Sequence, residues 1–364
     1  MEKAVYMTFD SCLLCDVIPL ETGNALLVLN SASDPFVHFV SQHLRAGVIT
    51  LAEDNVAILQ KVRSGLADLS REHPPTVLHI QHVAFHNYIL HQPTNTHDIA
   101  VMNLLYQPSN AWILYGLRVA FGALKAGGCL YVVGAKDRGI LTVAKRMRDL
   151  FGDVETVVIS KGQRVVCARK AAVVEAPTLF NDKGGLDEGE LDLSLHVFAA
   201  NKLDEGTRLL LDVLDVRASD IALDLGCGAG FIGLHIARLA SKGQVTMIDA
   251  SLAAVAASQR AVEQSNLHNM RVLPSDGAQA VMAERFDLVV TNPPFHQGGI
   301  QTTSIAERFV RDAARVLRPG GRFYLVANRF LKYEPVLASC FNNVREVGGN
   351  ARYKVIFASG AKNK

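Results

Sequence analysis

The residues Asn292, Pro293, Pro294 and Phe295 form the segment of this chain whose chemistry is most specific. Two consecutive prolines remove two backbone N–H donors and fix the chain, so nearby carbonyl oxygens have no local helix or sheet partner. The side-chain oxygen of Asn292 and the carbonyl oxygen of Pro293 can accept hydrogen bonds from an NH2 group. Phe295 offers a flat face on which a ring can stack. The segment predicts a site for the exocyclic amine of a nucleobase, with a plain double-proline turn as the alternative. His296 follows, and we interpret it as binding substrate or water, with proton acceptance left open.

A glycine-rich loop lies about 65 residues upstream and predicts a cofactor pocket. An apolar stretch over residues 221–225 has the pattern of a strand, and it leads through Gly226, Gly228 and Gly230 into a helical pattern. Glycines at the carboxyl end of a strand permit a tight turn and a close approach of the backbone to a ligand. The spacing departs from the G-x-G-x-x-G of dinucleotide-binding loops. Asp224 precedes the first glycine, where it can receive an ammonium group or shape the loop.

Acidic residues follow the next two predicted strands. Asp249 ends a strand about 20 residues beyond the loop, a position from which a carboxylate accepts hydrogen bonds from both ribose hydroxyls. Asp276 and Gly277 come after a third strand and are placed to meet an adenine ring, although a surface turn would use the same residues. The glycine loop and these acidic residues could bind either S-adenosyl-L-methionine or a dinucleotide. The Asn292 segment favours the first, because a sulfonium methyl needs only an aligned amine. No residue set for hydride chemistry favours a nicotinamide-dependent oxidoreductase.

The chain contains two copies of one α/β unit. DIAVMNLLYQPSNAW from Asp98 matches DLVVTNPPFHQGGIQ from Asp287, and LKAGGCLYVVG from Leu124 matches LRPGGRFYLVA from Leu317. The first copy has Asn103 followed by leucines and no comparable glycine cluster, so we expect it to bind no cofactor and to serve as scaffold or substrate surface. The predicted architecture is a degenerate domain over residues 1–170, a Gly- and Pro-containing linker over 171–193, and a catalytic domain over 194–364.

Composition limits the remaining possibilities. The 364 residues include 49% hydrophobic and 20% charged residues, as in ordinary globular proteins. No apolar run is long enough to span a membrane and the N-terminus has no signal-peptide pattern, so we expect a cytoplasmic protein. Six dispersed cysteines predict free thiols, and the Cys12/Cys15 pair lacks the partners of a zinc site.

With these residues in place, the region from about 194 to 359 resembles the bacterial ribosomal RNA guanine-N2 methyltransferases, most closely those of the small subunit. The resemblance is carried by VFAANKLDEGTRLLL from Val197, the glycine loop, NPPFHQG, VANRFLKYEPVL and RYKVIFA. It implies two tandem Rossmann-like class I methyltransferase domains, each with a mostly parallel sheet flanked by helices. It also implies that the glycine loop and the acids after the strands contact the cofactor, and that residues 292–295 position the base. Further cofactor contacts are implied for Lys202, Thr207 and Asn292. For Lys202 and Thr207 the alternatives are a surface charge and a helix cap.

The resemblance implies methylation of the N2 amine of a guanine in ribosomal RNA, most readily 16S rRNA free or in the 30S ribosomal subunit. We expect the protein to be a monomer. The His-Gln-Gly after the motif is also similar to large-subunit enzymes, so the subunit stays open. Other acceptors are an adenine amine in DNA and a glutamine amide in protein, and the non-enzymatic alternative is a ribosome-assembly factor. Arginines of the last third are candidates for a phosphate-binding face: Arg308, Arg311, Arg315, Arg318, Arg322 and Arg329.

Overall fold

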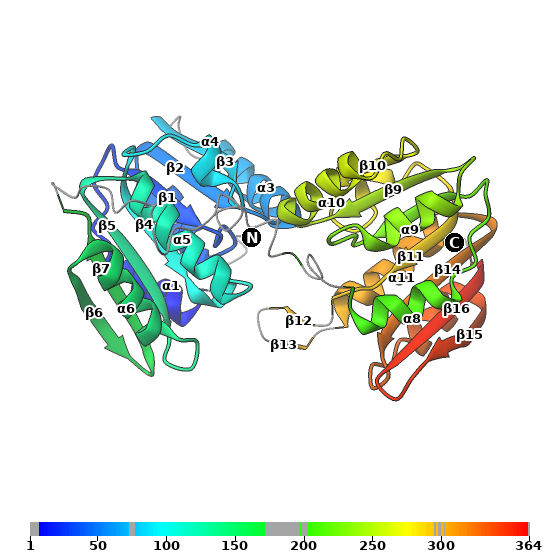
Figure 1. The fold of residues 1–364 in the computed structure, drawn as a ribbon. Helices are drawn as coiled ribbons and strands as arrows, with labels where there is room; N and C mark the ends of the chain where they lie inside the picture. Colours follow the sequence, from blue (N-terminus) through cyan, green and yellow to red (C-terminus); the bar gives the residue numbers. More distant parts are fainter. Residues whose placement is uncertain are drawn as a thin grey trace. The chain divides into compact units, whose positions relative to one another are not determined.

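The computed structural model describes residues 7–72, 77–171, 197, 203–294, 296–297, 300–301 and 303–362. The chain divides into two compact units, Met1–Leu193 and Ser194–Lys364. Apart from Ala171, the predicted linker lies outside the described residues. Each unit is an open α/β sheet with helices on both faces (Figure 1).

The first unit has a seven-stranded sheet in the order β3-β2-β1-β4-β5-β7-β6. Neighbours from β3 to β5 are parallel, whereas β7 runs antiparallel to β5 and β6. Its elements are α1 (Phe9–Val17), β1 (Ala25–Leu29), α2 (Pro35–His43), β2 (Ala46–Glu53), α3 (Val56–Glu72), β3 (Val77–Ala84), α4 (Tyr88–His91), β4 (His97–Asn103), η1 (Leu104–Tyr106), α5 (Asn110–Ala123), β5 (Leu124–Ala135), α6 (Ile140–Phe151), β6 (Val154–Ser160) and β7 (Gln163–Arg169).

The second unit repeats this topology, with the strand order β10-β9-β8-β11-β14-β16-β15. Its elements are α8 (Glu205–Val213), β8 (Ile221–Leu225), α9 (Phe231–Leu239), β9 (Gln244–Asp249), α10 (Leu252–Gln264), β10 (Met270–Pro274), η3 (Gln279–Val281), β11 (Phe286–Thr291), the hairpin β12 (His296–Gln297) and β13 (Ile300–Gln301), α11 (Ser304–Val316), β14 (Leu317–Asn328), α12 (Glu334–Cys340), β15 (Phe341–Gly349) and β16 (Tyr353–Ala361). The identical strand order confirms the prediction of two tandem Rossmann-like domains.

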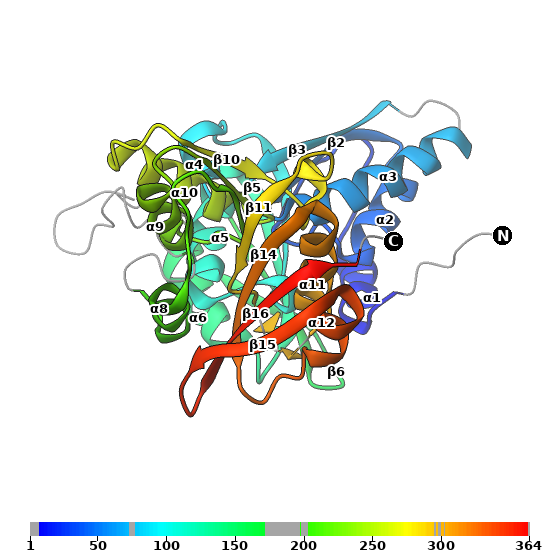
Figure 2. The ribbon, with the colours of Figure 1, turned by 90° about the vertical axis from the view of Figure 1, so that its right-hand side faces the viewer.

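Two apolar layers enclose the sheet of the second unit. Successive side chains of a strand point to opposite faces, so Leu223 and Val289 enter the layer under α11 and α12, whereas Ala222 and Leu288 enter the layer under α8 and α9. Figure 2 shows these helix pairs on opposite sides of β11 and β14. Burial on both faces explains the nearly continuous apolar runs of the central strands, and it leaves the strand ends as the place for polar chemistry.

Two negative findings concern the described residues only. No helix among them is long and apolar enough to cross a membrane. They also contain no cluster of three or more side chains arranged to hold a metal ion. Cys12 and Cys15 both lie in α1, where burial raises the pKa of Cys15 to about 12.

Candidate active site

The carboxyl edge of the second sheet brings together residues from four strands. Strands β8, β9, β10 and β11 are parallel, so their ends meet at one edge, as expected for ligand sites of open α/β sheets. The Thr291 hydroxyl, at the end of β11, donates to the carbonyl oxygen of Leu225, at the end of β8, over 2.6 Å. The Asn292 segment and the glycine loop are therefore neighbours, as their positions after strands predicted.

The glycine loop is shaped by contacts with β9. The backbone N–H groups of Gly226 and Cys227 both donate to the carbonyl oxygen of Ile248, at 2.9 and 3.0 Å. Gly226 has φ +79°, and a Cβ placed there would lie 2.9 Å from a ring atom of Phe309. A side chain at this position would be strained and would collide with the core, so the chain needs glycine here.

Asp224 lies beneath this loop and is fully buried. One carboxylate oxygen, Oδ2, accepts from the N–H of Gly233 in the first turn of α9, over 2.8 Å. The other, Oδ1, is buried without a hydrogen-bond partner among the described residues. Burial, with a smaller contribution from Asp249, raises the pKa of Asp224 to about 7. Asp224 thus shapes the loop, and its unpartnered oxygen leaves an acceptor for a cationic group.

Asp249, at the end of β9, is held rigidly at the mouth of the loop. Its Oδ2 accepts from the N–H of Gly228 over 3.0 Å, and its Oδ1 accepts from the N–H of Ser251 over 2.9 Å. Each carboxylate oxygen has a second lone pair, so these bonds orient the group without exhausting its capacity to accept from hydroxyls. The open backbone of the loop, the orphaned oxygen of Asp224 and this carboxylate fit the aminoacyl and ribose parts of S-adenosyl-L-methionine.

The third acidic position is part of an ion pair. The carboxylate of Asp276 accepts from the guanidinium of Arg308 in α11. At Gly277, a Cβ would lie 2.5 Å from Oδ2 of Asp312, which accepts from the N–H of Ala278 over 3.1 Å. Arg308 is therefore directed at the predicted adenine-binding corner. The contact of Asp276 with adenine stays a prediction, and one of its oxygens is engaged in the ion pair.

The amide of Asn292 is oriented by the start of α8. Its Nδ2 donates to the Thr207 hydroxyl at 2.9 Å and to Oδ2 of Asp204 at 3.3 Å. A carboxylate oxygen can only accept, so the amide nitrogen must face Asp204, and the amide oxygen is left to face away from this pair. Thr207 in turn donates through its hydroxyl to Asp204. Pro293 is buried and Pro294 is exposed.

Asp204 was not singled out in the sequence. It is the N-cap of α8, because its Oδ1 accepts from the N–H of Thr207 at 3.1 Å. The alternative of Thr207 as the cap is wrong: Thr207 is the third residue of the helix and bridges Asp204 to Asn292. An aspartate three residues before a threonine at the start of an apolar helical pattern is the signal that could have identified the cap.

Three predicted residues cannot be placed in this network. Lys202 and Phe295 lie outside the described residues. His296 begins β12 and pairs with Gln301 of β13, but its side chain also lies outside the described part. Their roles stay predictions.

The six arginines proposed for a phosphate-binding face are all in ion pairs. Arg322 is buried between Asp215 and Asp220, with its Nη2 2.5 Å from an oxygen of Asp220, so its expected contact with phosphate is wrong. In each of the other five pairs the arginine side chain is exposed. These pairs are Arg308 with Asp276, Arg311 with Glu307, Arg315 with Asp312, Arg318 with Asp287 and Arg329 with Glu346. Surface pairs of this kind are weak and do not by themselves define an RNA-binding face.

The corresponding edge of the first unit is filled by its own side chains. Where the second unit has its glycine loop, the first has Asn30 at φ +47° followed by Ser31. Asn103 donates through Nδ2 to Asp34 over 2.8 Å. Gln107 donates through Nε2 to the carbonyl oxygens of Leu29 and Asn103, both at 3.1 Å. These buried polar side chains bond to one another and to the backbone where the second unit has its open glycine loop, although Oε1 of Gln107 has no partner among the described residues.

Comparison with known proteins places this chain in a family. Residues 190–357 match the model of the methyltransferase small domain. The ribosomal RNA small subunit methyltransferase C of Hahella chejuensis is 35% identical over 250 residues, covering 66% of this chain and 72% of the relative. The enzyme of the same name from Shewanella loihica is 31% identical over 273 residues, covering 73% and 78%.

A solved structure that matches nearly the whole chain is also similar. The Thermus thermophilus 16S rRNA N2 G1207 methyltransferase, in complex with AdoMet and guanosine, superimposes with a TM-score of 0.79 at 29% identity, covering 98% of this chain and 93% of that one. This match extends over both units of the chain. The chain belongs to the family of ribosomal RNA small subunit methyltransferases C.

Proposed function

We propose that the second unit transfers the methyl group of S-adenosyl-L-methionine to the exocyclic N2 amine of a guanine in 16S rRNA. The observation that carries this proposal is the Asn292 amide, whose nitrogen is held by Thr207 and Asp204 beside the glycine loop. The relatives are small-subunit methyltransferases, among them an enzyme bound to AdoMet and guanosine, and they support this substrate and favour the small subunit over the large one.

The chemistry of this chain's residues follows from their orientation. The Asn292 oxygen and the Pro293 carbonyl accept the two N–H groups of the amine, which turns the nitrogen lone pair toward the loop. The cofactor supplies an activated methyl on a sulfonium centre, so alignment is the main requirement. Both acceptors bind the amine more strongly as it acquires positive charge, which stabilises the transition state more than the ground state. The methylated nitrogen returns to neutrality by losing one of its protons to water.

The acidic residues have separate tasks in this proposal. Asp224 receives the cofactor's ammonium group through its unpartnered oxygen, Asp249 accepts from the ribose hydroxyls, and Asp276 meets the adenine. Gly226, Gly228 and Gly230 let the backbone approach the cofactor. Lys202, Thr207, Gly277 and Asn292 complete the predicted cofactor contacts, and Pro294 with Phe295 completes the base-binding corner.

The first unit is proposed to hold substrate and to bind no cofactor, because its own side chains occupy the loop region. The partner is 16S rRNA, free or in the 30S ribosomal subunit. Such a substrate places the enzyme in the cytoplasm, and we propose that it acts as a monomer.

The test is transfer of radiolabelled methyl to 16S rRNA, offered free and in 30S particles that lack the modification, followed by mapping of the labelled guanine. Asn292→Ala should lower turnover at least about tenfold, equivalent to about 1.4 kcal/mol of lost transition-state stabilisation. Asn343→Ala, an exposed asparagine on β15, is the matched control and should be unaffected. Label that entered only DNA or protein, or none of these acceptors, would refute the proposal.

A further inference from the structure

An exposed aromatic side chain lies beside the strand that carries the Asn292 corner. Phe330 is 59% exposed, the highest fraction among the large apolar side chains that the structure describes. It follows the end of β14, and β14 is the parallel neighbour of β11, with Leu325 opposite Thr291. A single exposed apolar side chain is ordinary on a protein surface, so this ring bears on function only together with the groups that surround it.

Phe330 lines a hollow of about 550 Å³. Its other lining residues are Asn328 and Arg329 from the end of β14, and Ala351 and Arg352 from the turn between β15 and β16. The two walls are joined by a hydrogen bond from the N–H of Arg329 to the carbonyl oxygen of Arg352, at 2.8 Å. The two walls of the hollow are therefore fixed relative to one another by the backbone of the sheet edge.

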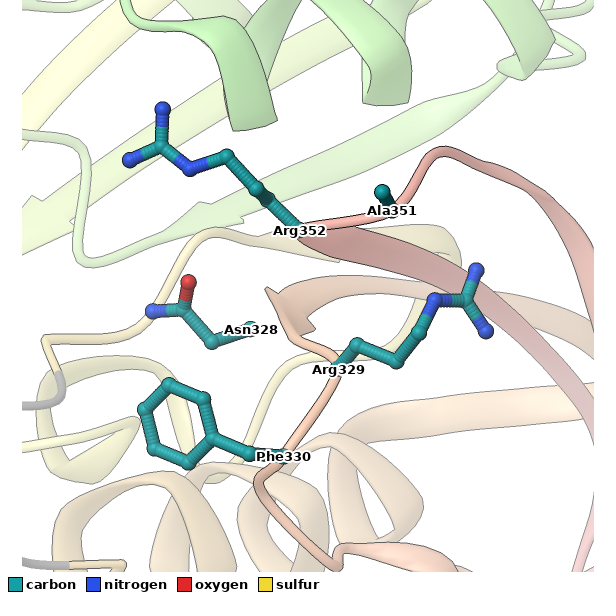
Figure 3. A pocket seen from close by; sticks show the side chains of 5 residues that line it. All are labelled: Asn328, Arg329, Phe330, Ala351 and Arg352. Atoms are coloured by element: carbon teal, nitrogen blue, oxygen red, sulfur yellow. The ribbon is translucent and has the colours of Figure 1, made fainter.

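Some polar groups of the hollow are held by bonds within the protein, and others can bind a ligand. Arg329 points away from the other side chains (Figure 3) and is engaged by Glu346 at 2.8 Å and by the carbonyl oxygen of Asn350 at 2.9 Å. The side chains of Asn328, Phe330 and Arg352 extend to the same side (Figure 3). The Asn328 amide makes no hydrogen bond within the described part of the chain.

Arg352 reaches from this hollow to the start of α8, where Asp204 contacts Asn292. Its guanidinium lies 3.3 Å from the carboxylate of Glu205, the residue after Asp204, and near the ring of Tyr353. Both partners of the pair are exposed, so the pair is weak and a phosphate can compete for the arginine.

We propose that this hollow binds the nucleotide next to the target guanine in the RNA substrate. The base of that nucleotide stacks on Phe330, the Asn328 amide hydrogen-bonds its edge, and Arg352 contacts its phosphate. An aromatic face, an amide and a guanidinium are the groups that recognise an unstacked nucleotide in single-stranded RNA. The inference rests on the proposed function, and it adds a second contact that a free nucleoside does not make.

The test compares two ligands in the presence of S-adenosylhomocysteine: free guanosine, and a 16S rRNA fragment containing the mapped guanine. Phe330→Ala should weaken binding of the fragment about tenfold, or about 1.4 kcal/mol, and should leave binding of guanosine unchanged. Phe330→Tyr should retain fragment binding, because the stacking face is kept. Leu239→Ala, at the far end of α9, removes an apolar side chain that is 46% exposed and serves as the control.

The outcomes are distinguishable. Equal loss for guanosine and fragment would mean that the hollow holds the target base itself, and unchanged binding of both would mean that it holds no nucleotide; either overturns the inference. Methyl transfer by the wild-type protein, measured in the same preparation, decides the proposed function separately.

Discussion

The orientation of the Asn292 amide can be tested by exchanging its partners. In Asn292→Asp the amide nitrogen, which lies 3.3 Å from an oxygen of Asp204, is replaced by a second carboxylate oxygen. Two unit charges at that separation repel by about 5 kcal/mol at an effective dielectric of about 20. Because uptake of a proton relieves part of this, we expect a net loss of about 2 to 4 kcal/mol in the free energy of unfolding near pH 8.

The reciprocal double variant restores a donor and an acceptor at the same place. In Asp204→Asn with Asn292→Asp, the new amide at position 204 can donate to the new carboxylate, and asparagine remains a good N-cap for α8. Urea unfolding of the two single variants and the double variant should give a coupling free energy above about 1.5 kcal/mol. Turnover should fall at least about tenfold in Asn292→Asp and recover in part in the double variant, which still presents an acceptor oxygen.

The pH dependence supplies an internal control. The defect of Asn292→Asp should shrink as the pH falls toward about 5, because the carboxylate pair then shares a proton. A coupling free energy near zero, or an Asn292→Asp enzyme as active as the wild type, would show that Asp204 does not orient the amide.

Three further predictions concern burial and strain in the second unit. Burial raises the pKa of Asp224 to about 7, so the folded state binds this proton more tightly than the unfolded state and stability falls as the pH rises from about 4 to about 7. Without cofactor at pH 8, urea unfolding should give Asp224→Asn a free energy of unfolding a few kcal/mol above that of the wild type, and this difference should be small at pH 4. A difference that did not change with pH would contradict this prediction. Arg322→Met leaves a buried aspartate unpaired and should cost about 3 to 5 kcal/mol, whereas the exposed pair of Arg318 should contribute less than about 1 kcal/mol; equal effects in thermal unfolding would refute the distinction. Gly226→Ala and Gly320→Ala impose the same strain at φ +79°, but only the first meets a core phenylalanine ring, so calorimetry should show weakened cofactor binding in the first variant alone.

The sequence alone was sufficient to locate the features whose position is local. The glycine loop, the double proline and the acids after successive strands could be placed at strand ends because each depends on backbone freedom or on a neighbouring apolar run; their contacts with cofactor and base stay predictions. The repeated pattern around Asn103 and Asn292 predicted two sheets of the same topology, and the structure has the same strand order in both units. A continuous apolar run is a property of neighbouring residues, so it predicts that a central strand is buried on both faces.

Tertiary structure decided which side chains became partners. Asp204 and Asn292 are 88 residues apart, and only the folding of α8 against the end of β11 sets the direction of the amide. The same holds for Arg322, which looked like a surface charge and is buried against Asp220, 102 residues away. Hydrogen bonds and ion pairs depend on distances of a few ångströms between segments that the sequence does not relate, so the pattern of residues could nominate the site but not its internal contacts.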